Sequence, residues 1–224
     1  MFIGHYGIAL AAKKLAPRTS LGTLFLAANL LDLIWPTLLL LGVESVRIDT
    51  SQRGVSPLVF TNYPWTHSLV AVCVWAVLLG AAHFAWARDR RAALVVGGLV
   101  ISHWLLDAIV HRPDLLLVPG GHWAIGFGLW RSTVATLIVE LGLVAFGLLA
   151  FLRAGAHTRR GPLWALVAFL VAIYLASVFG PPPPSVAAIA WAGQAQWLIV
   201  LAAFWIDPER GAHTHADPVG TRAA

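Results

Sequence analysis

The sequence contains few charged residues. Asp, Glu, Lys and Arg make up 11% of its 224 residues, while hydrophobic residues make up 59%. A soluble domain carries roughly 25% charged residues. A surface that faces water throughout cannot be built from this composition, so we exclude a soluble enzyme, a disordered chain and a nucleic-acid-binding module. The composition predicts an all-α polytopic membrane protein.

Cysteine is also scarce. Cys73 is the only one, and it lies within an apolar run. The sequence therefore excludes an internal disulfide and a thiolate metal cluster, and it gives no support to redox chemistry. No basic residue precedes the first apolar stretch, because Lys13 and Lys14 follow it. We therefore do not expect a cleaved secretory signal.

Long apolar runs dominate what is present. A hydrocarbon core of about 30 Å needs about 20 apolar residues in a helix. The runs predict about six transmembrane helices, at 20–41, 66–87, 92–111, 129–152, 162–180 and 185–206. Segment 2–15 is too short to span, so we expect a short N-terminal helix that lies at the interface or dips into the protein as a half-helix. Residues 1–206 would form one bundle domain, and 207–224 a disordered cytoplasmic tail.

The basic residues predict the orientation. Going along the chain, eleven of the 15 Lys and Arg fall on one side of the expected membrane, and only Arg47, Arg53, Arg112 and Arg131 fall on the other. Basic loops stay in the cytoplasm. We therefore expect a multi-pass protein with both termini in the cytoplasm.

Ionisable residues inside a membrane are costly, so each is a candidate functional residue. The expected spans carry Asp32, His67, His103, Asp107 and Glu140, and His111 lies at the end of the third. At 1.5 Å per residue, Asp32, His103 and Glu140 all lie about 18–21 Å from the cytoplasmic ends of their helices. Asp107 lies one turn further out. The polar set is thus expected in the outer half of the bundle.

His103, Asp107 and His111 recur at every fourth residue and line one stripe of a helix. Ligands one turn apart can meet a single metal ion. Imidazole and carboxylate without thiolate suit a divalent transition metal, Zn first, with Mn or Fe as alternatives. The structural alternative is an interhelical hydrogen bond that only fixes packing. Ser68 and Ser102 lie beside histidines, but we expect their hydroxyls to bond back to helix carbonyls rather than act as nucleophiles.

Four short elements follow one another in order: His5, Leu30-Leu31-Asp32, Thr66-His67-Ser68 and His103-x-x-x-Asp107. This order resembles the bacterial membrane-bound metal-dependent hydrolases of the YdjM-like family, over about residues 1–115. The resemblance implies a small inner-membrane bundle. It also implies that His5, Asp32, His67, His103 and Asp107 are the metal set.

These observations favour an inner-membrane metal-dependent hydrolase, with Glu140 or His111 as general base or acid. A site in the outer half suggests a lipid or lipid-linked substrate, with membrane lipids as partners and no nucleic acid. The alternative is a proton-coupled transporter or permease that uses the same Asp, His and Glu residues. A third interpretation is a scaffold that holds metal without turnover.

Overall fold

The computed structural model describes residues 1–52, 54–154 and 159–208. Residues 209–224 of the expected disordered tail, and the basic residues Arg53, Arg210 and Arg222, lie outside the described residues.

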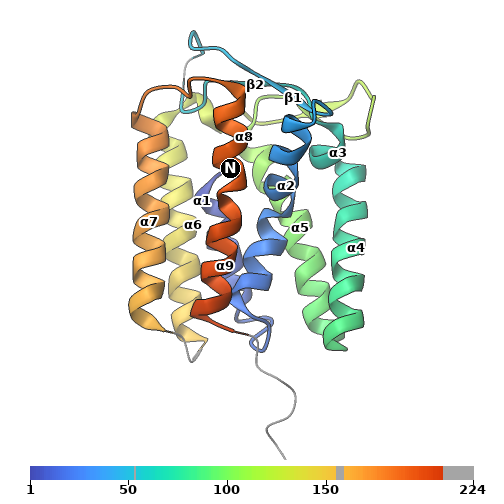
Figure 1. Ribbon diagram of the computed structural model, residues 1–224, viewed down its shortest axis with the longest axis vertical. Coiled ribbons are helices and arrows are strands. Elements are labelled where there is room, and N and C mark those ends of the chain that lie inside the picture. The colour runs from blue at the N-terminus through green and yellow to red at the C-terminus, as the bar shows by residue number, and fades with distance from the viewer. Residues whose placement is uncertain (53, 155–158, 209–224) are drawn as a thin grey trace, which may run out of the picture.

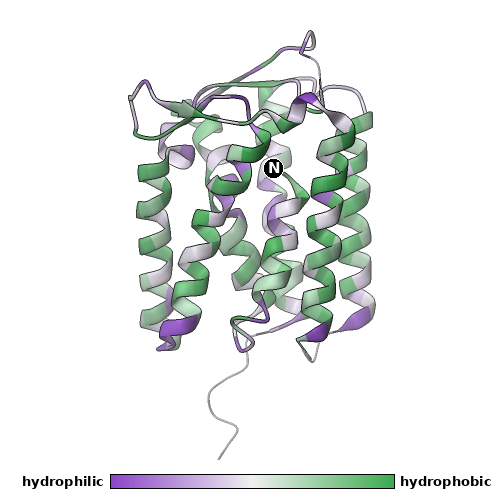
Figure 2. Cartoon of the chain, turned by 180° about the vertical axis from the view of Figure 1, so that it is seen from behind, coloured by the Kyte–Doolittle hydropathy of each residue, from purple (hydrophilic) through white to green (hydrophobic). Residues whose placement is uncertain are grey.

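The chain is an all-α polytopic membrane protein. In the described part, six helical stretches are long and apolar enough to cross a membrane: α2 (Leu21–Leu40), α4 (Leu69–Ala87), α5 (Arg90–Val110), α6 (Thr133–Arg153), α7 (Arg160–Phe179), and α8 (Val186–Gln194) continued by α9 (Gln196–Ile206). Their outer faces are apolar (Figure 2), and Val77, Leu94 and Ile138 are 70%, 78% and 68% exposed. Such faces are stable against lipid rather than water. The predicted spans are confirmed to within a few residues.

Hydroxyl and carboxylate side chains start most of these helices. Each accepts a hydrogen bond from the backbone amide three residues on, which is N-capping. The capping residues are Ser20 for α2, Ser68 for α4, Asp89 for α5, Ser132 for α6 and Ser185 for α8. Because Asp89 directly follows the left-handed residue that ends α4, α4 and α5 form a tight antiparallel pair.

Small strands cover one end of the bundle, which we call the hairpin end (Figure 1). There β1 (Ser45–Ile48) pairs antiparallel with β2 (Leu58–Asn62), and β3 (Leu115–Leu116) pairs with β4 (Ala124–Ile125). The opposite end, where α4, α6 and α7 meet their basic residues, is the basic end.

The second predicted span begins too early. It was expected from residue 66, but α3 (Pro64–His67) is a separate turn and α4 begins only at Leu69. Pro64 occupies the first position of α3, and Ser68 takes an extended backbone and caps α4. The break directs His67 away from the line of α4. The fourth span likewise begins at Thr133, after a 3₁₀ turn at Leu129–Arg131.

The short helix α1 (Ile3–Ala12) lies inside the bundle, so segment 2–15 is a half-helix rather than an interfacial one. It packs against α2, α5 and α6, and Ile3, Tyr6 and Leu10 are fully buried. A helix that is apolar all round is stable only when buried. The first residue of the chain consequently lies within the bundle (Figure 1).

Two glycines allow α1 to pack this closely. A Cβ atom added at Gly147 of α6 would lie 1.9 Å from the carbonyl oxygen of Gly7, and one added at Gly7 would lie 2.6 Å from the backbone of Leu143. The two backbones are thus in direct contact, as in close packing of membrane helices through small residues.

A buried ion pair closes the basic end. The Lys13 ammonium contacts the Asp207 carboxylate and donates to the carbonyl oxygen of Thr19 at 2.6 Å. Lys13→Met would leave Asp207 buried without its cation, which we expect to cost about 3–5 kcal/mol. Thermal unfolding in detergent would measure this loss. Lys14→Met is the matched control, because Lys14 is exposed; equal stability of the two variants would contradict the prediction.

Candidate metal centre

Four helices bring the five residues of the predicted metal set together. His5 comes from α1, Asp32 from α2, His67 from α3, and His103 with Asp107 from α5. His5, His103 and Asp107 form one group of potential ligand atoms lying within 4.8 Å of one another, and Asp32, His67 and His103 form another. All are buried except Asp32, whose side chain is 25% exposed. Access to the site is therefore on the Asp32 side.

Four of the ligand atoms form a ring in which nitrogen and oxygen alternate. Asp32 Oδ1 lies 3.5 Å from His67 Nε2 and 3.7 Å from His103 Nε2. Asp107 Oδ2 lies 3.7 Å from His67 Nε2 and 3.1 Å from His103 Nε2. We call these atoms the four-atom ring.

The backbone fixes the proton of His103. Its Nδ1 lies 2.7 Å from the carbonyl oxygen of Ala28, which can only accept, so Nδ1 carries the proton. The Nε2 lone pair then points at two carboxylate oxygens, which are also acceptors. His103 Nε2 is buried and makes no hydrogen bond with any described residue. A nitrogen that faces two acceptors is stable only when a positive charge lies between them, carried either by a proton on Nε2 or by a bound metal ion.

A second relay fixes His67. The Thr66 hydroxyl donates to Glu44 Oε2 at 2.7 Å, so it must accept the proton of His67 Nδ1, also at 2.7 Å. The Nε2 atom of His67 therefore presents a lone pair to the ring. Partners of this kind fix the tautomer and orientation of metal-ligating histidines. Glu44 was not among the residues predicted from the sequence. Its contact with Thr66 joins a loop to the start of α3, so no local sequence pattern indicates it.

Asp107 divides its oxygens between two environments. Oδ2 belongs to the four-atom ring, whereas Oδ1 contacts the Met1 ammonium and lies 3.2 Å from His5 Nε2. The His5 ring also stacks on His103, with centroids 3.7 Å apart and planes 5° apart. His5 thus lies beside the ring and holds two of its members.

The residues present fit a divalent ion. An ion bound by imidazole and carboxylate at about 2.0–2.1 Å in tetrahedral geometry separates neighbouring ligand atoms by about 3.3 Å. Four of the six separations among the ring atoms are 3.1–3.7 Å and bracket that value. Asp32 and Asp107 together carry the two negative charges that would neutralise a divalent cation, and imidazole ligands would add no charge. This nitrogen and oxygen donor set suits Zn, Mn or Fe.

Glu140, a predicted acid or base, holds the start of α1. Its carboxylate accepts hydrogen bonds from the amides of Phe2, at 2.9 Å, and Gly4, at 2.8 Å. Free amides at a helix N-terminus favour a carboxylate. Glu140 thereby fixes the end of α1 that carries His5.

His111, the other predicted acid or base, is oriented by a carboxylate. Its Nδ1 lies 3.1 Å from Asp114 Oδ1, which also accepts from the Tyr63 hydroxyl at 2.8 Å. Burial lowers the pKa of His111 below its ordinary value, so the ring is neutral at pH 7. Within the described residues, Nε2 of His111 has no hydrogen-bond partner.

The two serines behave as expected. Ser68 donates to the carbonyl oxygen of Pro64 at 2.6 Å, and Ser102 to that of Leu99 at 2.7 Å. Both hydroxyls therefore bond to nearby helix carbonyls, and neither forms a nucleophile–histidine pair.

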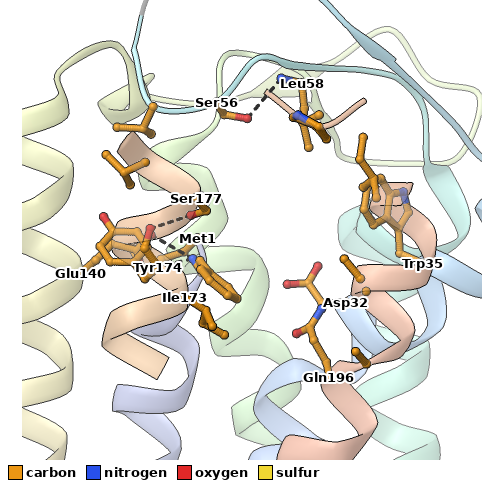
Figure 3. A pocket seen from close by; sticks show the side chains of 18 of the residues that line it. Met1, Asp32, Trp35, Ser56, Leu58, Glu140, Ile173, Tyr174, Ser177 and Gln196 are labelled. Carbon is orange, nitrogen blue, oxygen red and sulfur yellow. Dashed lines mark hydrogen bonds between the residues drawn. The ribbon is translucent and has the colours of Figure 1, made fainter. Parts of the chain in front are cut away.

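A cavity of about 900 Å³ opens onto the site. The polar residues that line it include Asp32, His67, Asp107, His111 and Glu140. In Figure 3, Asp32 and Gln196 face the cavity from one side, and Glu140 and Tyr174 face it from the other. The four-atom ring is therefore reachable from the cavity through Asp32.

Comparisons with protein-family models, with characterised proteins and with solved structures find no match. The function of the protein is therefore inferred from the geometry of the site.

Proposed function

We propose that the chain is an inner-membrane metal-dependent hydrolase acting on a lipid or lipid-linked substrate. One observation carries the proposal: two carboxylate oxygens and the Nε2 atoms of two histidines form the four-atom ring, and the buried Nε2 of His103 has no hydrogen-bond partner in the described part of the chain. The resemblance of the motif order to the YdjM-like hydrolases agrees with it.

Asp32, His67, His103 and Asp107 would hold the ion, and His5 would position Asp107 and His103 from beside the ring. A bound divalent ion supplies Lewis acidity and lowers the pKa of a coordinated water towards about 7. Because Glu140 is engaged by two backbone amides, we assign proton transfer to His111 instead.

His111 Nε2 takes one proton from the attacking water, while Asp114 holds the ring through Nδ1. The water oxygen bonds to the carbonyl carbon or phosphorus of the substrate as the bond to the leaving oxygen breaks. His111 then returns the proton to that oxygen, so that acid and base are the same group.

The positive-inside pattern supports the proposed orientation. Arg88, Arg153 and Arg160 lie at the ends of α4, α6 and α7 that form the basic end, and Lys13 pairs there with Asp207; this end would face the cytoplasm. The four-atom ring lies further toward the hairpin end and would be reached from the outer leaflet. This location favours a substrate that resides in the membrane.

The arrangement gives less support to a proton-coupled transporter. Between the site and the basic end, the bundle interior is filled by apolar side chains such as Leu10, Leu24 and Phe25, all buried. The polar Asn29 in that region bonds to its own helix at Phe25. A transport pathway needs polar groups along both halves of the membrane.

A hydrolysis assay tests the proposal. We expect the protein in phosphatidylethanolamine–phosphatidylglycerol nanodiscs loaded with Zn²⁺ or Mn²⁺ to release a lipid product detectable by mass spectrometry, and chelation to abolish the release. Asp32→Asn should lower the rate by at least about 100-fold, because it removes a ligand charge without changing shape.

Asp49→Asn, in the hairpin loop, is the matched control and should retain full activity. Unchanged thermal stability of Asp32→Asn would separate a catalyst from a metal-stabilised scaffold. Absence of product with every metal and lipid class, together with metal-independent proton flux, would instead favour the transporter.

A further inference from the structure

The cavity beside the site extends far beyond the polar residues. It separates α7 from α8 and α9, with β2 and the loop before it across its hairpin end (Figure 3). From α7 it is lined by Leu166, Phe169, Ile173 and Val178. The α7 wall is mainly apolar, with Tyr174 and Ser177 as its polar residues, so the cavity joins a largely hydrophobic compartment to the candidate metal centre.

Small side chains on α8 keep this space open. Ala188 and Ala192 line the cavity where larger residues would fill it. At the basic end α7 meets α9, where the amide of Arg159 donates to Ile206 at 3.3 Å and the guanidinium lies 4.6 Å from the centre of the Trp205 ring. The cavity begins beyond this contact.

The dimensions fit a lipid tail. From Leu166 to Val178 the α7 wall extends over about 18 Å, comparable with the hydrocarbon depth of one leaflet, about 15 Å. A partner helix is too large to be the occupant. A helix of that length and about 10 Å in diameter would need roughly 1,400 Å³, whereas the cavity has a volume of about 900 Å³. An apolar wall at membrane depth also disfavours a column of water.

We propose that the cavity between α7 and α8 is an acyl-chain binding site. It would hold one tail of a membrane lipid and present the bond at the junction of tail and headgroup to the Asp32 side of the four-atom ring. The role of the ring in this inference rests on the proposed function, whereas tail binding depends only on the walls. The substrate class is therefore an acyl-chain lipid.

Photo-crosslinking tests this inference. The probe is phosphatidylethanolamine with a diazirine near the end of a palmitoyl chain, present in trace amounts in phosphatidylethanolamine–phosphatidylglycerol nanodiscs. We expect crosslinks at Ile173 of α7 and Ile189 of α8, which face the cavity. Ala192→Phe should reduce them by about tenfold, because it fills the space.

Ala187→Phe is the matched control, because Ala187 lies on the same helix, is exposed and does not line the cavity. Ser177→Phe fills the cavity from the opposite wall and should repeat the loss if Ala192→Phe fails to fold. Equal crosslinking in wild type, Ala192→Phe and Ser177→Phe would overturn the inference.

Chelator-treated protein separates this inference from the proposed function. Crosslinks that persist without metal, in a protein that hydrolyses no lipid even after Zn²⁺ or Mn²⁺ is restored, would support the acyl-chain site and count against the hydrolase. Metal-dependent hydrolysis without crosslinks on α7 and α8 would support the hydrolase and count against the acyl-chain site.

Discussion

His103→Gln is expected to lower the affinity of the protein for Zn²⁺ by more than about 100-fold. Loss of a hydrogen-bond partner of a ligand costs 10- to 100-fold in affinity, and this variant removes a ligand itself. At the position where His103 Nε2 faces Asp32 and Asp107, Gln offers only an amide oxygen, which binds Zn²⁺ much more weakly than an imidazole nitrogen does. Competition with a chromophoric chelator would measure the change.

His83→Gln is the matched control. His83 is also a buried histidine whose Nε2 has no partner among the described residues, but it belongs to neither group of potential ligands. We expect wild-type affinity for this variant. Equal affinities of His103→Gln and wild type would show that zinc is held elsewhere.

Gly147→Val is expected to dislodge α1. The new Cβ would meet the carbonyl oxygen of Gly7 at 1.9 Å, and backbone cannot move aside as a flexible side chain can. Overpacking costs typically 1–3 kcal/mol, and we expect more than about 3 kcal/mol here. Displacing α1 would also remove His5 from Asp107 and His103.

Thermal unfolding and hydrogen exchange over Ile3–Ala12 would report this change. Gly142→Val on the same helix is the control, because a Cβ there meets nothing within 4 Å. Retained protection of α1 in Gly147→Val, with the melting temperature of the control, would contradict the packing described for the two glycines.

The transmembrane helices could be predicted from the sequence because span length and apolar composition are local properties. The start of the second span could not, because the Pro64 turn and the Ser68 cap break an otherwise continuous run. The position of α1 was open for a different reason. Its apolar composition fits both an interfacial and a buried helix, and the contact of Gly7 with Gly147, which buries it, is a tertiary feature.

In the site, too, local features could be predicted from the sequence and tertiary contacts could not. Asp32, His67, His103 and Asp107 could be predicted because ionisable groups are rare inside membranes. His5 was implied by the resemblance of the motif order, and the structure places the five residues in two groups that share His103. The part played by Glu140 depends on the insertion of α1, and that of Glu44 on a loop that approaches Thr66. Neither contact follows from spacing along a helix.

The central claim is that the four-atom ring holds one divalent ion. Metal analysis of the purified wild-type protein after loading with Zn²⁺, combined with X-ray absorption at the zinc edge, tests it most directly. We predict about one zinc per chain, surrounded by nitrogen and oxygen atoms at about 2.0–2.1 Å with imidazole scattering and no sulfur. Failure to retain zinc, or a zinc environment without imidazole, would contradict the assignment.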